Sequence, residues 1–186
     1  KSAPFKVDRL GHHCSFRGGI GFAKHLQGER SGDFRFIKVS DMNLFGNETC
    51  IRYSNNWISE ATAKSLVGKP FPPGTTVFAK VGAALLLNRR RKLVEPTFID
   101  NNMMGATPLH GTDENYLFYK LSSLDLGRLC QVGAIPSVNQ GDLSAIKIFF
   151  HPLPEQRKIA EILGTCDEAI DAQQNLIKQK ELRQKG

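Results

Sequence analysis

The feature that most constrains this chain is a proline-led entry into a long amphipathic stretch near its C-terminal end. An extended apolar segment, residues 149–151, runs into Pro152 and Pro154. Proline fixes φ and lacks an N–H, so it is accepted in the first turn of a helix and not in its interior. Pro154 therefore marks a helix entry. The pattern beyond it predicts one unbroken helix from Glu155 to about Lys185, roughly 45 Å long.

Apolar side chains recur along this predicted helix at spacings of three and four residues, which places them on one stripe. The opposite face mixes both signs of charge, as in helices that pair through heptads. An isolated helix of this kind is marginal in water, so we expect the stripe to pack against another helix. The alternative is that the stripe lies back on the rest of the chain. The stripe consists of Ile159, Ile162, Leu163, Cys166, Ala169, Ile170, Leu176 and Ile177.

The net charge of +7 is carried entirely by the part that precedes the helix. Residues 154–186 contain six Lys or Arg and six Asp or Glu, which cancel, so residues 1–153 hold the whole excess. A basic globular part joined to a neutral arm indicates a polyanionic partner such as nucleic acid. Basic domains without such a partner are common, so charge alone does not decide between these readings.

Ahead of the helix, short segments rich in β-forming residues are separated by Gly, Pro and Asn turns. The predicted strands cover residues 10–16, 34–41, 75–80, 94–99 and 145–150. The predicted short helices cover residues 60–67 and 116–124, with a turn at 138–143. This order predicts an α+β fold, with a mixed-sheet globular domain in residues 1–152 and the pairing helix, a coiled coil, in residues 153–186.

Basic and amide side chains are the candidate contacts to nucleic acid. Four consecutive cations in a predicted loop suit phosphate contacts, and Asn can pair with adenine through two hydrogen bonds. Solvated charge runs and turn asparagines are also common, and the sequence does not place these residues on one face. The candidates for phosphate contacts are Arg89, Arg90, Arg91 and Lys92. Weaker candidates for either role are Lys24, Arg35, Lys38, Asn55, Asn56, Lys80 and Asn101.

Motifs of enzyme chemistry are absent or incomplete. The glycine-rich residues 18–24 lack the spacing of a phosphate-binding loop. His12, His13 and Cys14 could bind a metal, but no second cluster at metal-site spacing accompanies them. The four cysteines are scattered singly, as in reduced cytoplasmic proteins. We therefore expect no catalysis, cofactor or metal on this chain, and a cytoplasmic location.

Targeting and membrane segments are likewise not expected. The longest apolar run, Val81–Leu87, is far short of the roughly 20 residues of a membrane span. The first six residues have no apolar region of a secretory signal. Because the sequence does not begin with Met, we expect it to belong to a longer reading frame.

The proline–helix junction resembles a known family. Residues 152–163, Pro-Leu-Pro-Glu-Gln-Arg-Lys-Ile-Ala-Glu-Ile-Leu, are similar to the junction between target-recognition domain and conserved helix in the specificity subunit of Type I restriction–modification systems. Three further segments, residues 36–41, 73–82 and 137–148, resemble strands of that family in the same order. The resemblance thus spans nearly the whole chain, and the proline–helix motif is its most specific part.

The resemblance implies DNA recognition without catalysis. A full subunit of the family carries two recognition domains, each followed by a long helix. The helices pair antiparallel as a spacer, and each domain reads one half of a split target. Methylation subunits dock on the helices and methylate adenine from S-adenosylmethionine, and a restriction subunit translocates and cuts. S-adenosylmethionine, ATP and Mg²⁺ are therefore expected on the partner subunits.

This chain has one domain and one helix, so it resembles a natural half-subunit or an excised piece. Two copies paired through the stripe would mimic a whole subunit, which favours a two-fold dimer. Recognition loops vary in this family, so no base-reading residue is carried over from it. Two other hypotheses remain: a scaffold that binds proteins through the helix, and an enzyme that uses His12, His13 and Cys14.

Overall fold

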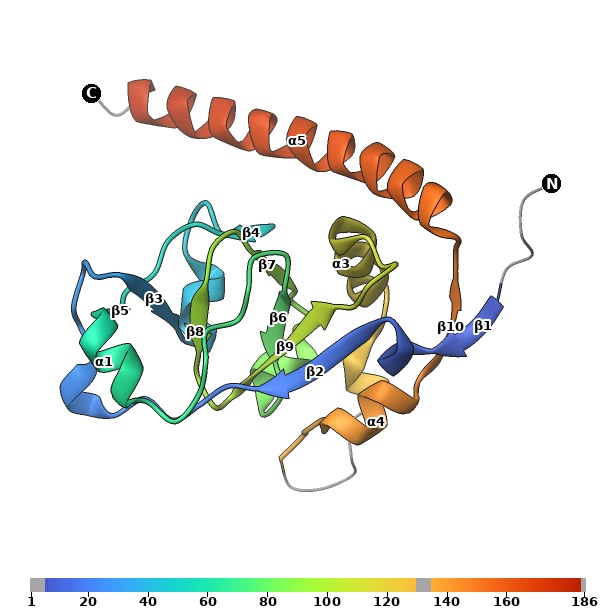
Figure 1. Ribbon diagram of the computed structural model, residues 1–186. Helices are drawn as coiled ribbons and strands as arrows, with labels where there is room; N and C mark the ends of the chain where they lie inside the picture. The colour runs from blue at the N-terminus through green and yellow to red at the C-terminus, as the bar shows by residue number, and fades with distance from the viewer. Residues whose placement is uncertain (1–5, 130–134, 185–186) are drawn as a thin grey trace.

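In a computed structural model, which describes residues 6–129 and 135–184, short strands form three small sheets beneath one long helix (Figure 1). The strands are β1 (Lys6–Arg9), β2 (Cys14–Gly18), β3 (Phe34–Ile37), β4 (Cys50–Ile51), β5 (Trp57–Ile58), β6 (Thr76–Ala79), β7 (Arg91–Leu93), β8 (Thr97–Ile99), β9 (Met103–Pro108) and β10 (Lys147–Phe150). The α-helices are α1 (Glu60–Ser65), α2 (Ala83–Leu86), α3 (Glu114–Ser122), α4 (Gln140–Ala145) and α5 (Leu153–Gln184). Short 3-10 turns cover Leu10–His12, Lys24–Leu26, Val39–Asn43 and Leu126–Leu129.

The sheets mix parallel and antiparallel pairing. The largest has the order β2-β9-β6-β7-β4, in which only the β4–β7 pair is parallel. A second sheet, β5-β3-β8, pairs β3 with β8 in parallel. The β1–β10 pair joins the N-terminal strand to the strand that leads into α5. Mixed sheets combined with helices confirm the predicted α+β class.

The main core lies between the five-stranded sheet and helices α3 and α4. Leu117 and Leu121 of α3 and Phe78 of β6 are at most 1% exposed and belong to one apolar cluster. The same cluster includes Ala160 of α5, and Ile159 packs against it. Ile159 was expected in the outward stripe. It instead belongs to the base of the helix, where α5 meets the domain.

The long helix starts at its prolines. The carbonyl of Pro152 accepts the N–H groups of Glu155 and Gln156 at 2.9 and 3.0 Å, so Leu153 and Pro154 form the first turn. From there α5 passes above α3 and over the loop before β4 (Figure 1). The Tyr119 hydroxyl donates to Asp167 at 2.8 Å, and the Lys178 amine lies 3.2 Å from the centre of the Phe45 ring. One face of α5 is thus held to the domain at several points along its length.

Several predicted elements are confirmed and others are wrong. Helices α1 and α3 and strands β6 and β10 form within the predicted ranges, to within two residues. The expected strand at residues 10–16 is a 3-10 turn followed by β2, and the one at 34–41 ends at Ile37. The expected turn at 138–143 contains the start of α4, which Asn139 caps by accepting the Asp142 N–H at 2.9 Å.

Strand β9, a central strand of the large sheet, has no counterpart among the predicted strands. Its residues include Gly105 and Pro108, which normally disfavour strands. Gly105 is required there because an added Cβ would collide with the ring of Phe71. Close packing of a distant aromatic side chain therefore places a glycine in a central strand.

Candidate nucleic-acid interface

The run of four cations is divided between buried and surface roles. Arg90 is 3% exposed, donates to the Leu124 carbonyl at 3.1 Å, and stacks 5.1 Å from the centre of the Phe78 ring. Burial lowers the pKa of Arg90 to about 10, which a nearby carboxylate, Asp125, partly offsets. The guanidinium is thus used inside the protein, which gives no support to a contact between Arg90 and DNA, and that contact stays a prediction.

The rest of the run lies on the side of the domain that α5 covers. Arg91 and Lys92 belong to β7 rather than to a loop. Arg91 donates to the Met42 carbonyl at 3.2 Å, and Lys92 contacts Asn115 and, at 3.5 Å, Glu114. Arg89 is exposed and donates to Asn43.

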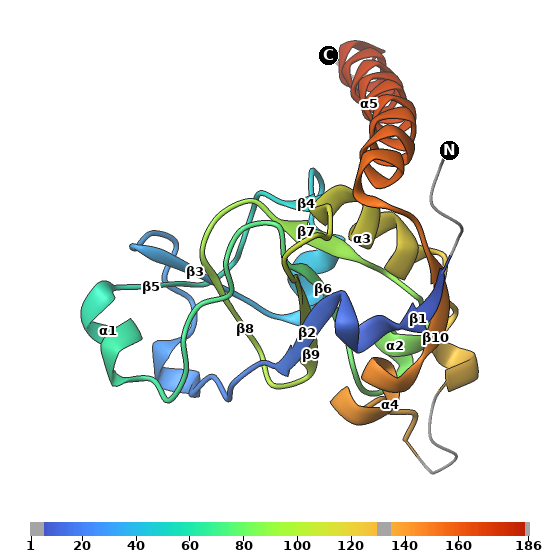
Figure 2. The same ribbon diagram turned by 45° about the vertical axis from the view of Figure 1, so that its right-hand side comes forward.

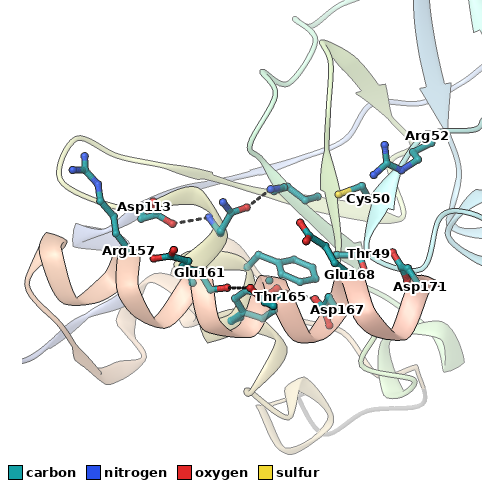
Figure 3. Close-up of a pocket in the computed structure, with 16 residues that line it drawn as sticks. Thr49, Cys50, Arg52, Asp113, Arg157, Glu161, Thr165, Asp167, Glu168 and Asp171 are labelled. Carbon is teal, nitrogen blue, oxygen red and sulfur yellow. Dashed lines mark hydrogen bonds between the residues drawn. The ribbon is translucent and has the colours of Figure 1, made fainter. Parts of the chain in front are cut away.

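A cleft of about 470 Å³ separates this side of the domain from α5 (Figure 3). Lys92 and Arg52 line it from the domain, and the helix contributes Glu161, Asp167, Glu168 and Asp171. The helix is neutral overall, yet its carboxylates are concentrated on the face that meets the basic strand. These cations therefore face the protein's own helix, which accounts for their presence without DNA.

Two further candidate cations have partners within the domain. Arg35 is 13% exposed, pairs with Glu95, and lies 4.8 Å from the centre of the Trp57 ring. Lys38 donates to Gln27 at 2.9 Å. Their positions are explained by the packing of β3, so the structure gives no reason to place DNA there. Lys24 is exposed in a 3-10 turn and stays a prediction.

The Asn55–Asn56 pair has a structural role. Asn56 is 6% exposed and accepts the Gly28 N–H at 2.9 Å, so its side chain is used by the fold and its contact with DNA stays a prediction. Asn55 is exposed, but its amide donates to Asp41 at 2.8 Å. Asp41 is fully buried and also accepts the Lys38 N–H at 2.7 Å. The pair therefore holds the segments on both sides of β3, Asn56 the one before it and Asn55 the one after it.

Lys80 and Asn101 are the two candidates that the fold brings together. They line a concavity of about 360 Å³ that lies between the end of β6, the β8–β9 turn and the start of α4. The turn and α4 lie on the side of the domain away from α5 (Figures 1 and 2). Other polar residues of this concavity are Asn102, Ser137, Asn139 and Gln140. These four were not among the predicted site residues, although the adjacent amides Asn101 and Asn102 are visible in the sequence.

The side chains of the His12–Cys14 segment each have contacts within the domain. His12 contacts Asp8 at 2.7 Å, and the His13 ring stacks on Phe150 with centroids 3.5 Å apart. Cys14 is buried, and burial raises the pKa of its thiol to about 12, so it is an unreactive core residue. Within residues 6–129 and 135–184, no group of three or more His, Cys, Asp or Glu could hold a metal ion.

The stripe of α5 is exposed along most of its length. Ile162 is 66% exposed, Ile170 53% and Ile177 55%. The other exposed members are Leu163, Cys166, Ala169 and Leu176. Among the described residues, no second helix covers them, so pairing of the helix stays a prediction. None of the described helices has both the length and the hydropathy needed to span a membrane.

The fold and its arm define a class of protein, a mixed α+β domain carried on a long helix. Residues 4–181 match the model of the Type I restriction modification DNA specificity domain. Because this match covers nearly the whole sequence, the chain belongs to the family of Type I restriction–modification DNA specificity domains. Among curated proteins none matches it.

Solved structures share the fold at low sequence identity. A chain from a structure on complex assembly and conformational transition of the type I R-M system matches with a TM-score of 0.73 and 17% identity, over 98% of this chain and 44% of that one. The S subunit from M. genitalium matches with a TM-score of 0.65 and 15% identity, over 94% of this chain and 42% of that one. The HsdS subunit from Thermoanaerobacter tengcongensis matches with a TM-score of 0.65 and 17% identity, over 92% of this chain and 40% of that one. This chain thus spans less than half the length of the subunits it resembles.

Proposed function

We propose that this chain reads one half of a split duplex DNA target and presents α5 to the other subunits of a restriction–modification complex. Its family membership makes it a DNA target-recognition domain of such a system. The observation that supports the finer proposal is the separation of two surfaces. A concavity lined by lysine and amide side chains lies away from α5, whereas α5 itself exposes an apolar stripe.

The pairing of two copies through α5 is part of the same proposal. The structures that this chain resembles are more than twice its length, and a second copy would supply a second domain and a second helix. Isoleucine side chains exposed by more than half on one face of a helix lose contact with water when such a helix pairs. The paired helices would then fix the distance between two DNA-reading domains.

In this proposal the chain has no catalytic step of its own. Its residues bind and orient DNA, and methylation and cleavage belong to the methylation and restriction subunits. S-adenosylmethionine, ATP and Mg²⁺ bind those subunits. The complex works in the cytoplasm, where it meets DNA.

The proposal is tested by the salt dependence of binding to duplex DNA. Cations that neutralise phosphates release counterions, so affinity should fall steeply between about 50 and 200 mM salt. Binding of the full chain is measured by fluorescence anisotropy, with poly-glutamate as a competitor that shares the charge of DNA without its bases. Specific binding should resist poly-glutamate. Failure to bind duplex DNA, or an affinity that does not change with salt, would contradict the proposal.

A second candidate function is a protein scaffold that docks through α5. The observation that favours it is the exposed stripe, which by itself requires a protein partner rather than DNA. In that case partner binding depends on α5, and the intact chain shows no preference for DNA over poly-glutamate. The same anisotropy experiment therefore separates the two candidates.

A further inference from the structure

The concavity away from α5 combines a lysine and several amides on backbone that is held rigidly. The Lys80 N–H donates to the Asn102 carbonyl at 2.9 Å, and the Lys80 carbonyl accepts the Val138 N–H at 3.0 Å. The Asn102 N–H donates to the Asp100 carboxylate at 2.8 Å. Three segments that are distant in sequence are thus linked by hydrogen bonds around one hollow. Buried Met104 and Val138 form its floor.

The polar side chains around this hollow divide into two groups. Asn139 is used by the fold, since it caps α4 and donates to Asp142 at 2.7 Å. Gln140 is also used when its amide oxygen and nitrogen are assigned the other way round, because the amide then donates to the Phe16 carbonyl at 3.1 Å and accepts the Gly18 N–H at 3.2 Å. The side chains of Lys80, Asn101 and Asn102 form no hydrogen bond or ion pair with any residue that the structure describes.

The three unused side chains differ from the other candidate contacts. Those other candidates have partners within the protein: Arg90 and Asn56 are buried, and Arg35 pairs with Glu95. Lys92 faces α5. Asn101 and Asn102 occupy the β8–β9 turn, and Lys80 follows β6 directly. This turn is short and is closed by a hydrogen bond from the Met103 N–H to the Asp100 carbonyl at 2.9 Å, so its side chains are more precisely placed than those on a long loop, as reading a base edge requires. Among the described residues, none that lines the hollow is acidic, and the nearby carboxylates of Asp100 and Asp142 accept hydrogen bonds from the Asn102 N–H and the Asn139 amide.

We infer that this hollow is the base-reading site, in which the Asn101 and Asn102 amides recognise an adenine in the major groove and Lys80 holds the adjacent phosphate. Asparagine donates to adenine N7 through its NH₂ group and accepts from N6 through its oxygen, a pairing that no other base offers in the same pattern. A lysine is a point charge suited to phosphate. The inference rests on the proposed function and names the residues that carry its specificity.

Selection from a random duplex DNA pool tests the inference. The full chain and its variants Asn101→Ala, Asn102→Ala and Lys80→Gln are each used to enrich sequences at low salt, where binding is strongest. Asn175→Ala and Lys158→Gln serve as matched controls, because both residues are exposed on α5. Thermal melting checks that all variants are folded.

The wild-type chain should enrich a sequence that contains adenine at a fixed position. At least one asparagine variant should lose discrimination at that position by about tenfold or more, with the other positions kept. Lys80→Gln should weaken binding to all sequences alike and lower the salt slope by about one. The two controls should select the wild-type sequence.

The failures of the two proposals are distinguishable. If the wild-type chain enriches no sequence, the proposed function fails and the inference falls with it. If it enriches a sequence that both asparagine variants select unchanged, the domain reads DNA elsewhere and only the inference is overturned. A loss of affinity that is uniform across sequences for both asparagine variants would assign them to the phosphate backbone and would also overturn it.

Discussion

Arg90 shows at the scale of a single residue how a cation becomes part of a core. Its guanidinium stacks near the Phe78 ring and donates to the carbonyls of Leu124 and Arg89, both at 3.1 Å. Its pKa is lowered by burial but stays well above neutral, so the group is charged at physiological pH. The side chain is therefore held by an aromatic face and by carbonyl oxygens rather than by a phosphate.

Removing the Arg90 guanidinium should therefore lower the stability of the protein without lowering its affinity for DNA. Arg90→Ala should lower the free energy of unfolding by about 1–3 kcal/mol, because buried carbonyl groups lose their donor. Arg89→Ala is the control, since Arg89 is exposed and should change stability by less than about 0.5 kcal/mol. Urea denaturation measures both. A variant of Arg90 that keeps full stability and loses DNA binding would restore it as a DNA contact.

At the scale of an element, α5 owes its direction to the glutamine in its first turn. Gln156 is 2% exposed, and its oxygen accepts the Asp113 N–H at 2.8 Å. Its NH₂ group donates to the carbonyls of His151 at 2.8 Å and Gly111 at 3.3 Å. One side chain thus joins the start of α5 to the loop before α3 and to the end of β10. This explains why the Pro-Leu-Pro-Glu-Gln junction continues into a helix of defined direction.

Replacing this glutamine should loosen the junction. Gln156→Leu keeps the size of the side chain but leaves the Asp113 N–H and the His151 carbonyl unpaired, so we expect a loss of about 2–4 kcal/mol in stability. Limited proteolysis should then cut between β10 and α5 faster than in the wild type. Gln179→Leu, an exposed position on the same helix, is the control. Equal proteolysis of the two variants would show that Gln156 does not hold the junction.

At the scale of the whole molecule, the two sides of the domain differ in what their polar side chains face. The basic strand β7 faces the carboxylates of α5, and the lysine and amides of the β6 and β8–β9 segments face away from it. The apolar stripe of α5 faces neither of these surfaces and is left exposed. The arm can therefore meet a partner without blocking the surface proposed to read DNA.

Disrupting the stripe should separate association from DNA binding. Replacing Ile162, Ile170 and Ile177 by Asp should make the chain monomeric in analytical ultracentrifugation, since three charges would be buried in a paired interface. Ala172, Asn175 and Gln179 are exposed on the face of α5 that lies away from the three isoleucines, and their replacement by Asp is the control. If the wild type is itself monomeric at high concentration, the stripe serves another protein and the dimer is contradicted.

The sequence by itself determined the elements whose signals are local. Pro152 and Pro154 and the apolar spacing beyond them are sufficient for α5, and β-forming runs between turn residues are sufficient for β6 and β10. Strand β9 was not predicted because its Gly105 is required by close contact with the ring of Phe71, a residue distant along the chain. The α+β class follows from the order of local signals and did not need the missing strand.

Only the tertiary structure decided which candidate contacts are available. Arg90 and Lys80 are both cations beside apolar runs in the sequence, yet one is buried against Phe78 and the other borders an open hollow. The accessibility of a side chain depends on which distant segments pack against it. The local spacing of residues in the sequence does not contain this information. The same holds for α5: its period predicts an apolar stripe, but only the packing of Ala160 and Gln156 onto the domain leaves that stripe facing outward.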